Sequence, residues 1–262
     1  MEEGLEMIIL QENCYICGNH SNFSIPEGAT LLREATCSKC GASIRNSDTA
    51  KIIVNKITGK SCSLSESLGT LNSVNILEAQ SLGPINRVLC ELPGYSCFEY
   101  IDSVAPGYSN EYGVMSNDLE NLTYKSNSFD LVISQDVLEH VNNPTKAFSE
   151  INRVLMMGGY HIFTVPIHEQ KPTISRSNLP KVFHGDPLRQ DGALVCTDWG
   201  NDICKFIDQY GMETEKFMVH NFYSPSEITN VDESYEEYLK TEAIYYYRYN
   251  SIVFASKKVR SL

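Results

Sequence analysis

The fold is decided near the middle of the chain, by the stretch Asn127-Ser-Phe-Asp-Leu-Val-Ile-Ser-Gln-Asp-Val-Leu-Glu-His140. Its first half, Phe129 to Ser134, has the apolar character of a strand that is buried on both faces of a parallel sheet. Asn143 and Pro144 follow as an N-cap and first-turn signal for a helix. The stretch therefore predicts one strand-turn-helix unit of an α/β fold.

Apolar residues recur at helical spacing after Pro144, at Ala147, Phe148, Ile151, Val154 and Leu155. Gly158 and Gly159 are expected to end this helix. Apolar runs alternate with amphipathic segments from residue 75 onward, which is the pattern of a parallel sheet with crossover helices. We expect strands over 75–79, 96–100, 160–166, 213–220 and 251–256, and helices over 47–58 and 83–92. A further helix is expected to be capped by Asp198, to include Trp199 and to stop at Gly211.

Length and charge exclude several classes of protein. The 262 residues fit one large domain with a small accessory one, and the net charge is −12. Residues 61–262 carry −11 of that charge, so the body lacks the basic surface that binds a phosphate backbone, and we do not expect nucleic acid as the partner. No apolar run approaches the roughly 20 residues of a membrane span. The acidic start leads into no apolar segment, so we expect a cytoplasmic protein.

Four cysteines form two matching motifs, Cys14-Tyr-Ile-Cys17-Gly18 and Cys37-Ser-Lys-Cys40-Gly41. Their spacing is that of a four-cysteine zinc ribbon, in which two turns each present two thiolates to one tetrahedral ion. Four thiolates leave no open coordination position, so the zinc would be structural. The alternatives are unmetallated thiols or a redox C-x-x-C pair.

The central stretch has a recognisable counterpart. Residues 127–141, the continuation Ala147-Phe-Ser-Glu-Ile-Asn-Arg-Val-Leu-Met-Met-Gly-Gly159 and the run Ile162-Phe-Thr-Val-Pro166 together resemble class I S-adenosylmethionine-dependent methyltransferases of the small-molecule and glycan type. The cysteine motifs and His184-Gly-Asp-Pro187 are similar to a bacterial subset that fuses a zinc ribbon to this domain and is often found with surface-polysaccharide functions. The resemblance implies an α/β, Rossmann-like doubly wound sheet with a small N-terminal zinc-ribbon module.

The same resemblance implies a division of the chain. We expect a zinc ribbon over 1–46, a helical linker over 47–69 and a class I methyltransferase domain over 70–262. Within that domain we expect an inserted loop over 168–197 and a helical insertion over 222–249. The loop has no clear periodicity and is long for a compact domain, which favours an active-site loop.

S-adenosylmethionine is the cofactor that the resemblance implies, and its binding residues follow by position. The loop after the first strand keeps an acid and one glycine where the family has Gly-x-Gly-x-Gly. Glu99 matches the acid that holds the ribose hydroxyls, Tyr100 is placed to pack on adenine, and Asp118 matches the acid that accepts the adenine amino proton. The expected cofactor-binding residues are Glu78, Gly83, Glu99, Tyr100, Asp118, Leu119 and Gln135.

Three residues are candidates for catalysis. His140 lies just beyond the carboxyl end of the 129–134 strand, where it could act as general base or position the acceptor; the alternative is a ring that packs under the next helix and bonds backbone. His184 and Asp186 could form a base with its orienting carboxylate, or a simple Gly-Asp-Pro turn.

The resemblance implies methyl transfer from S-adenosylmethionine to a small-molecule or sugar acceptor, with a role in surface-polysaccharide biosynthesis. Ser134-Gln135-Asp136 stands where many amino-group enzymes carry Asn/Asp-Pro-Pro-Tyr/Phe, which favours an oxygen acceptor or an unrelated amine. Two alternatives stay open: an RNA methyltransferase that binds its substrate through the zinc ribbon, and a scaffold that kept the fold and lost the cofactor.

Overall fold

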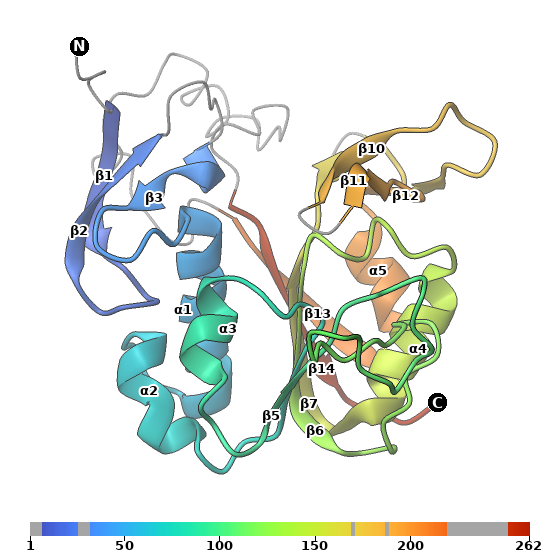
Figure 1. Ribbon diagram of the computed structural model, residues 1–262, viewed down its shortest axis with the longest axis horizontal. Coiled ribbons are helices and arrows are strands. Elements are labelled where there is room, and N and C mark those ends of the chain that lie inside the picture. Colours follow the sequence, from blue (N-terminus) through green and yellow to red (C-terminus); the bar gives the residue numbers. More distant parts are fainter. Residues whose placement is uncertain (1–6, 26–31, 169–170, 187–188, 219–250) are drawn as a thin grey trace. The chain divides into compact units, whose positions relative to one another are not determined.

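The computed structural model describes residues 7–25, 32–168, 171–186, 189–218 and 251–262 (Figure 1). The chain divides into two compact units. The first comprises the described parts of 1–73, 82–95 and 216–253, and the second comprises those of 74–81, 96–215 and 254–262. The helical insertion expected over 222–249 lies outside the described residues.

The first unit holds a small antiparallel sheet and three helices. Strands β1 (Met7–Asn13), β2 (His20–Ile25) and β3 (Thr36–Cys37) pair in the order β1-β2-β3, with a short 3-10 turn at Leu32–Glu34 before β3. The helices are α1 (Ile44–Thr58), α2 (Leu64–Leu71) and α3 (Pro84–Leu89).

Side-chain caps set where two of these helices begin. Helix α1 begins three residues before the expected position because Ser43 and Asn46 form a reciprocal capping box. Ser63 and Glu66 form a second box at the start of α2. Gly59 ends α1 at φ +69°, a left-handed conformation that glycine adopts without strain.

A six-stranded sheet runs through the chain, in the order β13-β14-β7-β6-β4-β5. Strands β4, β6 and β7 are parallel, whereas β14 is antiparallel to β7. Strand β5 lies beside β4 on one side, and the chain then crosses to form β6 on the other side of β4, so the strand order reverses between β4 and β6. This mixed sheet confirms the predicted Rossmann-like α/β fold class. Its strands are β4 (Ile76–Glu78), β5 (Tyr95–Cys97), β6 (Phe129–Gln135), β7 (Leu155–Thr164), β13 (Met212–Phe217) and β14 (Val253–Lys258).

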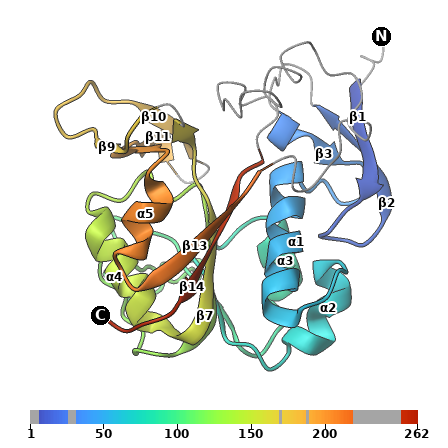
Figure 2. The same ribbon diagram turned by 180° about the vertical axis from the view of Figure 1, so that it is seen from behind.

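Helices α4 (Pro144–Val154) and α5 (Ile203–Asp208) lie side by side on one face of this sheet (Figures 1 and 2). The predicted start of α4 is confirmed: Asn143 caps it through a hydrogen bond from the Lys146 amide, and Pro144 takes the first position. Phe148 of α4 is fully buried at the centre of an aromatic cluster. Its ring partners are His161, Phe163, Trp199, Phe206 and Tyr210.

The glycine pair after α4 has a different role from the expected one. Helix α4 ends at Val154 and β7 begins at Leu155, so the prediction that Gly158 and Gly159 end the helix is wrong. Strand β7 pairs with β6 at Leu155 and again only at Tyr160, which leaves a bulge between them. Gly158 has φ +82°, and a Cβ on Gly159 would lie 2.9 Å from the Asp130 carbonyl oxygen. The bulge therefore requires both glycines.

The segment expected as a loop over 168–197 contains short strands. Strands β10 (Phe183–Asp186) and β11 (Arg189–Leu194) pair as an antiparallel hairpin. Strands β8 (Ile167–His168), β9 (Ile174–Ser175) and β12 (Thr197–Gly200) form a second small sheet in the order β8-β12-β9. Strands of two to six residues are too short to show a hydrophobic period.

The predicted cap at Asp198 is also wrong, because Asp198 and Trp199 belong to β12 and Asp202 occupies the N-cap position of α5. The Asp198 carboxylate accepts a 2.6 Å hydrogen bond from the Arg176 guanidinium instead. No helix in the described part of the chain has the length and apolar character of a membrane span.

Candidate functional site

The four cysteines of the two motifs converge on one point. The Gly18 and Gly41 amides each donate a 2.8 Å hydrogen bond to the carbonyl of the first cysteine of their own motif, and both glycines have positive φ, +75° and +71°. The four sulfur atoms lie within 4.8 Å of one another, and Cys14 Sγ is 3.7 Å from Cys40 Sγ. Zn–S bonds of about 2.3 Å place tetrahedral sulfurs about 3.8 Å apart, so the cysteine cluster (Cys14, Cys17, Cys37 and Cys40) fits zinc.

Burial and hydrogen bonds give the thiols different acidities. Burial raises the pKa of Cys14 far above its ordinary value and that of Cys40 to about 11. Burial also acts to raise the pKa of Cys37, but hydrogen bonds from Ser21 and from the Lys39 and Cys40 amides outweigh it and lower the pKa to about 7. Cys37 is therefore more readily ionised than Cys14 or Cys40, and a bound cation would replace the protons of those two thiols.

A second group of residues lies at the carboxyl ends of the sheet strands. Glu78 ends β4 and Gln135 ends β6, and these neighbouring strands flank the point where the strand order reverses. Both side chains are buried. Open α/β sheets bind their ligands at such a point, outside the carboxyl ends of the strands.

Glu99 lies two residues beyond β5 at the same edge. Its Oε1 accepts two hydrogen bonds from Ser81, at 2.6 Å from the amide and 2.9 Å from the hydroxyl. Burial raises the pKa of Glu99, against the effect of these two hydrogen bonds. A partly buried carboxylate with two acceptor oxygens has the chemistry to hold a pair of ribose hydroxyls.

One strand-like backbone contact brings Asp118 close to Glu99 and its neighbour Tyr100. The Asn117 amide donates to the Glu99 carbonyl at 2.9 Å, which places Asp118 beside the end of β5. Nearby Asp102 and Asp118 add to the effect of burial in raising the pKa of Tyr100. Asp118 accepts a 2.8 Å hydrogen bond from the Glu120 amide, and Leu119 is buried. The predicted adenosine residues Glu99, Tyr100 and Asp118 therefore share one edge of the sheet.

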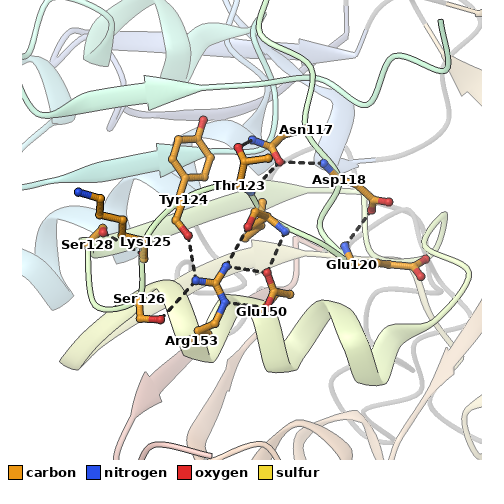
Figure 3. A network of polar contacts seen from close by, with 11 residues as sticks. Asn117, Asp118, Glu120, Thr123, Tyr124, Lys125, Ser126, Ser128, Glu150 and Arg153 are labelled. Atoms are coloured by element: carbon orange, nitrogen blue, oxygen red, sulfur yellow. Dashed lines mark hydrogen bonds and ion pairs between the residues drawn. The ribbon is translucent and has the colours of Figure 1, made fainter. Parts of the chain in front are cut away.

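Sequence reasoning missed the anchor of the loop that carries Asp118, which Figure 3 shows. Arg153 on α4 donates to the backbone carbonyls of Leu122 and Tyr124, at 2.9 and 2.8 Å. It also forms two 2.7 Å hydrogen bonds to both oxygens of Glu150, which lowers the pKa of Glu150. Glu150 in turn accepts from the Leu122 amide at 2.8 Å. The i,i+3 spacing of Glu150 and Arg153 on a helix was the available signal.

Gly83, the single glycine of the loop after β4, is the N-cap of α3 and has φ +122°. Non-glycine residues rarely adopt that backbone conformation. A Cβ at Gly83 would meet no atom of the described residues within 4 Å, so among them the requirement for glycine comes from the backbone and not from crowding.

The three predicted catalytic residues separate into two groups. His140 and His184 face each other edge-on with ring centroids 5.4 Å apart. Asp186 instead accepts a 2.8 Å hydrogen bond from Arg189, which also donates to the Tyr100 carbonyl at 3.0 Å. The carboxylate beside His184 is that of Glu139, with Oε1 3.7 Å from His184 Nδ1. Glu139 was not among the predicted site residues.

Comparison with known proteins supports part of the predicted relationship. Residues 98–163 match a family model described as a methyltransferase domain. A sarcosine/dimethylglycine N-methyltransferase from Aphanothece halophytica is 34% identical over 110 residues, which are 39% of this chain. The match spans only 38% of that relative's length. The predicted resemblance to S-adenosylmethionine-dependent methyltransferases is thereby confirmed.

Solved structures with a similar course of the chain have low sequence identity. The [4+2]-cyclase SpnF is 15% identical with a TM-score of 0.46, covering 84% of each chain. A 1,6-didemethyltoxoflavin-N1-methyltransferase from Burkholderia thailandensis is 12% identical with a TM-score of 0.39, covering 81% of this chain and 83% of that one. We draw no conclusion about the reaction from similarities at this level of sequence identity and TM-score.

Proposed function

We propose that this protein transfers the methyl group of S-adenosylmethionine to a small-molecule acceptor, on a hydroxyl oxygen of a sugar or glycan. The observation that carries the proposal is the grouping of Glu99, Tyr100 and Asp118 at the carboxyl edge of the sheet, inside the segment that matches a methyltransferase domain. The sheet order adds support, since Glu78 and Gln135 flank the point where the order reverses.

In this proposal each residue of the edge has one task. Glu99 binds the ribose hydroxyls, Tyr100 packs on the adenine ring, and Asp118 accepts from the adenine amino group. Leu119 contacts the adenine ring, and Glu78 and Gln135 contact the methionine part of the cofactor. Gly83 supplies the turn of the loop after β4. When bound, S-adenosylmethionine supplies a methyl group on a sulfonium, which an acceptor held in line displaces.

The acceptor is the finer part of the proposal. The Aphanothece halophytica relative is named as an N-methyltransferase, and the match spans 38% of its length. An oxygen acceptor is favoured by Ser134-Gln135-Asp136, which lacks the Asn/Asp-Pro-Pro-Tyr/Phe pattern of many amino-group enzymes. The role in surface polysaccharides rests on the resemblance alone.

The proposal includes zinc in the cysteine cluster as a structural ion. It is supported by the 3.7 Å distance between Cys14 Sγ and Cys40 Sγ and by the matched glycine turns. Metal analysis of the purified chain tests it, with at least one zinc per chain as the expected result.

Calorimetric titration with S-adenosylhomocysteine tests the cofactor site without knowledge of the acceptor. We expect one-to-one binding that Glu99→Ala abolishes and that Glu213→Gln, an exposed acid on β13, leaves unchanged. Absence of binding would favour a scaffold without cofactor. Methylation assays with nucleotide sugars and, in parallel, with sarcosine then decide between an oxygen and a nitrogen acceptor.

A further inference from the structure

Glu139, His140 and His184 bring three metal-binding side chains to one point in the second unit. One ligand atom from each lies within 4.8 Å of the other two. Glu139 Oε1 is 3.6 Å from His140 Nε2 and 3.7 Å from His184 Nδ1. These distances are longer than a hydrogen bond and close to the roughly 3.4 Å that separates two N/O ligands of a tetrahedral ion with 2.1 Å bonds.

A backbone hydrogen bond fixes the orientation of the His140 ring. His140 Nδ1 lies 2.8 Å from the carbonyl oxygen of Leu194 on β11. Because a carbonyl only accepts, Nδ1 carries the proton, and in the neutral ring Nε2 presents its lone pair. That lone pair lies beside the Glu139 carboxylate. Histidines that ligate metals are held in the same way, with the other ring nitrogen donating to a carbonyl or carboxylate.

The Glu139 carboxylate is buried and accepts no hydrogen bond from the residues that the structure describes. Its side chain is 2% exposed. Within the same part of the chain, its ion-pair partners within 4.0 Å are the two histidines. A buried charge in this state is destabilising unless a cation compensates it.

The backbone holds Glu139 firmly in this position. Its carbonyl accepts from the Cys196 and Thr197 amides at 2.7 and 3.1 Å. The turn that leads to it begins at Asp136, a non-glycine residue with φ +50°, which is strain of a kind that clusters at functional sites.

We infer that Glu139, His140 and His184, the edge metal site, bind a divalent first-row transition ion such as Mn²⁺, Co²⁺ or Zn²⁺. Two imidazoles and one carboxylate suit these ions better than Ca²⁺ or Mg²⁺, which prefer all-oxygen ligands. Three protein ligands leave coordination positions open, which separates this site from the closed cysteine cluster. The His184 side chain is 42% exposed, so an ion and a further ligand have access from solvent.

The use of the open positions rests on the proposed function. An acceptor hydroxyl bound to the ion would lose its proton to solvent more readily, because the cation stabilises the alkoxide. The alkoxide oxygen then forms a bond to the methyl carbon as the carbon–sulfur bond breaks, and S-adenosylhomocysteine leaves with the electron pair. In that case His140 and His184 act as ligands, and neither is the general base.

Mn²⁺ titration of the zinc-loaded full-length protein tests the site, with free Mn²⁺ followed by its electron paramagnetic resonance signal. Mn²⁺ is suited because thiolates prefer softer ions, so the cysteine cluster keeps its zinc. We expect one Mn²⁺ per chain, or two zinc ions per purified chain if zinc already fills the edge metal site. Glu139→Gln and His184→Asn are each expected to weaken Mn²⁺ binding at least tenfold or to remove the second zinc.

Glu213→Gln is the matched control and is expected to bind Mn²⁺ and zinc like the unaltered chain. His184 is partly exposed, so His184→Asn stays informative if Glu139→Gln fails to fold. One zinc and no Mn²⁺ bound, with and without S-adenosylhomocysteine, would overturn the inference, as would equal Mn²⁺ binding by both variants. Titration with S-adenosylhomocysteine in metal-free buffer separates the two proposals: product binding without Mn²⁺ binding leaves only the proposed function, and the reverse leaves only the edge metal site.

Discussion

The cysteine cluster and the edge metal site are built in opposite ways. The cysteine cluster repeats one local turn twice, with the same 2.8 Å amide–carbonyl hydrogen bond and nearly the same glycine φ in each. The edge metal site combines the turn after β6 with the first strand of the β10–β11 hairpin, and its ligands are of two kinds. A closed set of four identical ligands stabilises a fold, whereas an open set of three unlike ligands leaves room for chemistry. Loss of a ligand should therefore unfold the region around the cysteine cluster, whereas at the edge metal site it should remove function and leave the fold intact.

The largest expected effect is on the cysteine cluster. Cys37→Ser is expected to lower the zinc content by one ion per chain and to unfold the β1–β3 sheet, because structural zinc contributes on the order of 10 kcal/mol to such modules. Zinc analysis with hydrogen exchange of β1–β3 measures this. Cys62→Ser, outside the cluster, is the control. An unchanged zinc content in Cys37→Ser would show that the four cysteines do not form one site.

The next effect concerns the loop that carries Asp118. Arg153→Leu removes the two hydrogen bonds to backbone carbonyls and the pair with Glu150, so we expect a loss of about 2 kcal/mol in the free energy of unfolding. S-adenosylhomocysteine affinity is expected to fall as well, because the loop loses its anchor. Urea titration and calorimetry measure the two quantities. A stable variant with unchanged affinity would contradict the role assigned to Arg153, and Lys205→Leu on α5 is the control.

The pH dependence of product binding tests the sheet edge by itself. In the proposed cofactor site the carboxylate form of Glu99 accepts the ribose hydroxyls, and burial raises the pKa of Glu99. The affinity for S-adenosylhomocysteine should therefore be highest at high pH and fall about tenfold for each pH unit below the raised pKa of Glu99. The fall should begin above the ordinary glutamate pKa near 4.3. Calorimetry across this range measures it. In Glu99→Gln the profile is expected to be flat; an identical slope in that variant would assign the titration to another group.

The smallest expected effect is a difference in stability loss between alanine substitutions in the two cysteine turns. In Gly41→Ala the new Cβ would meet no atom within 4 Å in the described part of the chain, so we expect only the cost of a left-handed alanine, about 1 kcal/mol. In Gly18→Ala the new Cβ would lie 2.9 Å from Ser63 Oγ, the cap of α2, so we expect about 2 kcal/mol. Chemical denaturation of the two variants gives the difference. Equal losses would mean that Ser63 moves aside freely.

Local patterns were readable in the sequence, and contacts between distant segments were not. The cysteine motifs, strand β6 and the start of α4 each depend on residues a few positions apart, and the structure places all three as expected. The partnership of Glu139 with His184 joins residues 45 positions apart, which no spacing rule reveals. The glycine pair after α4 and the cap of α5 were misjudged for the same reason, because a β6–β7 bulge and an Arg176–Asp198 pair decide them.

The contact between the β10–β11 hairpin and the turn after β6 has a consequence for local opening of the chain. The Cys196 and Thr197 amides, just after the hairpin, both donate to the Glu139 carbonyl, and Leu194 of the hairpin holds the His140 ring. Detachment of the hairpin would therefore carry away His184, release His140 and expose these two amides in one step. Their solvent-exchange rates should slow together whenever an ion or an acceptor fills the site, so two backbone protons would report its occupancy without any assay of turnover.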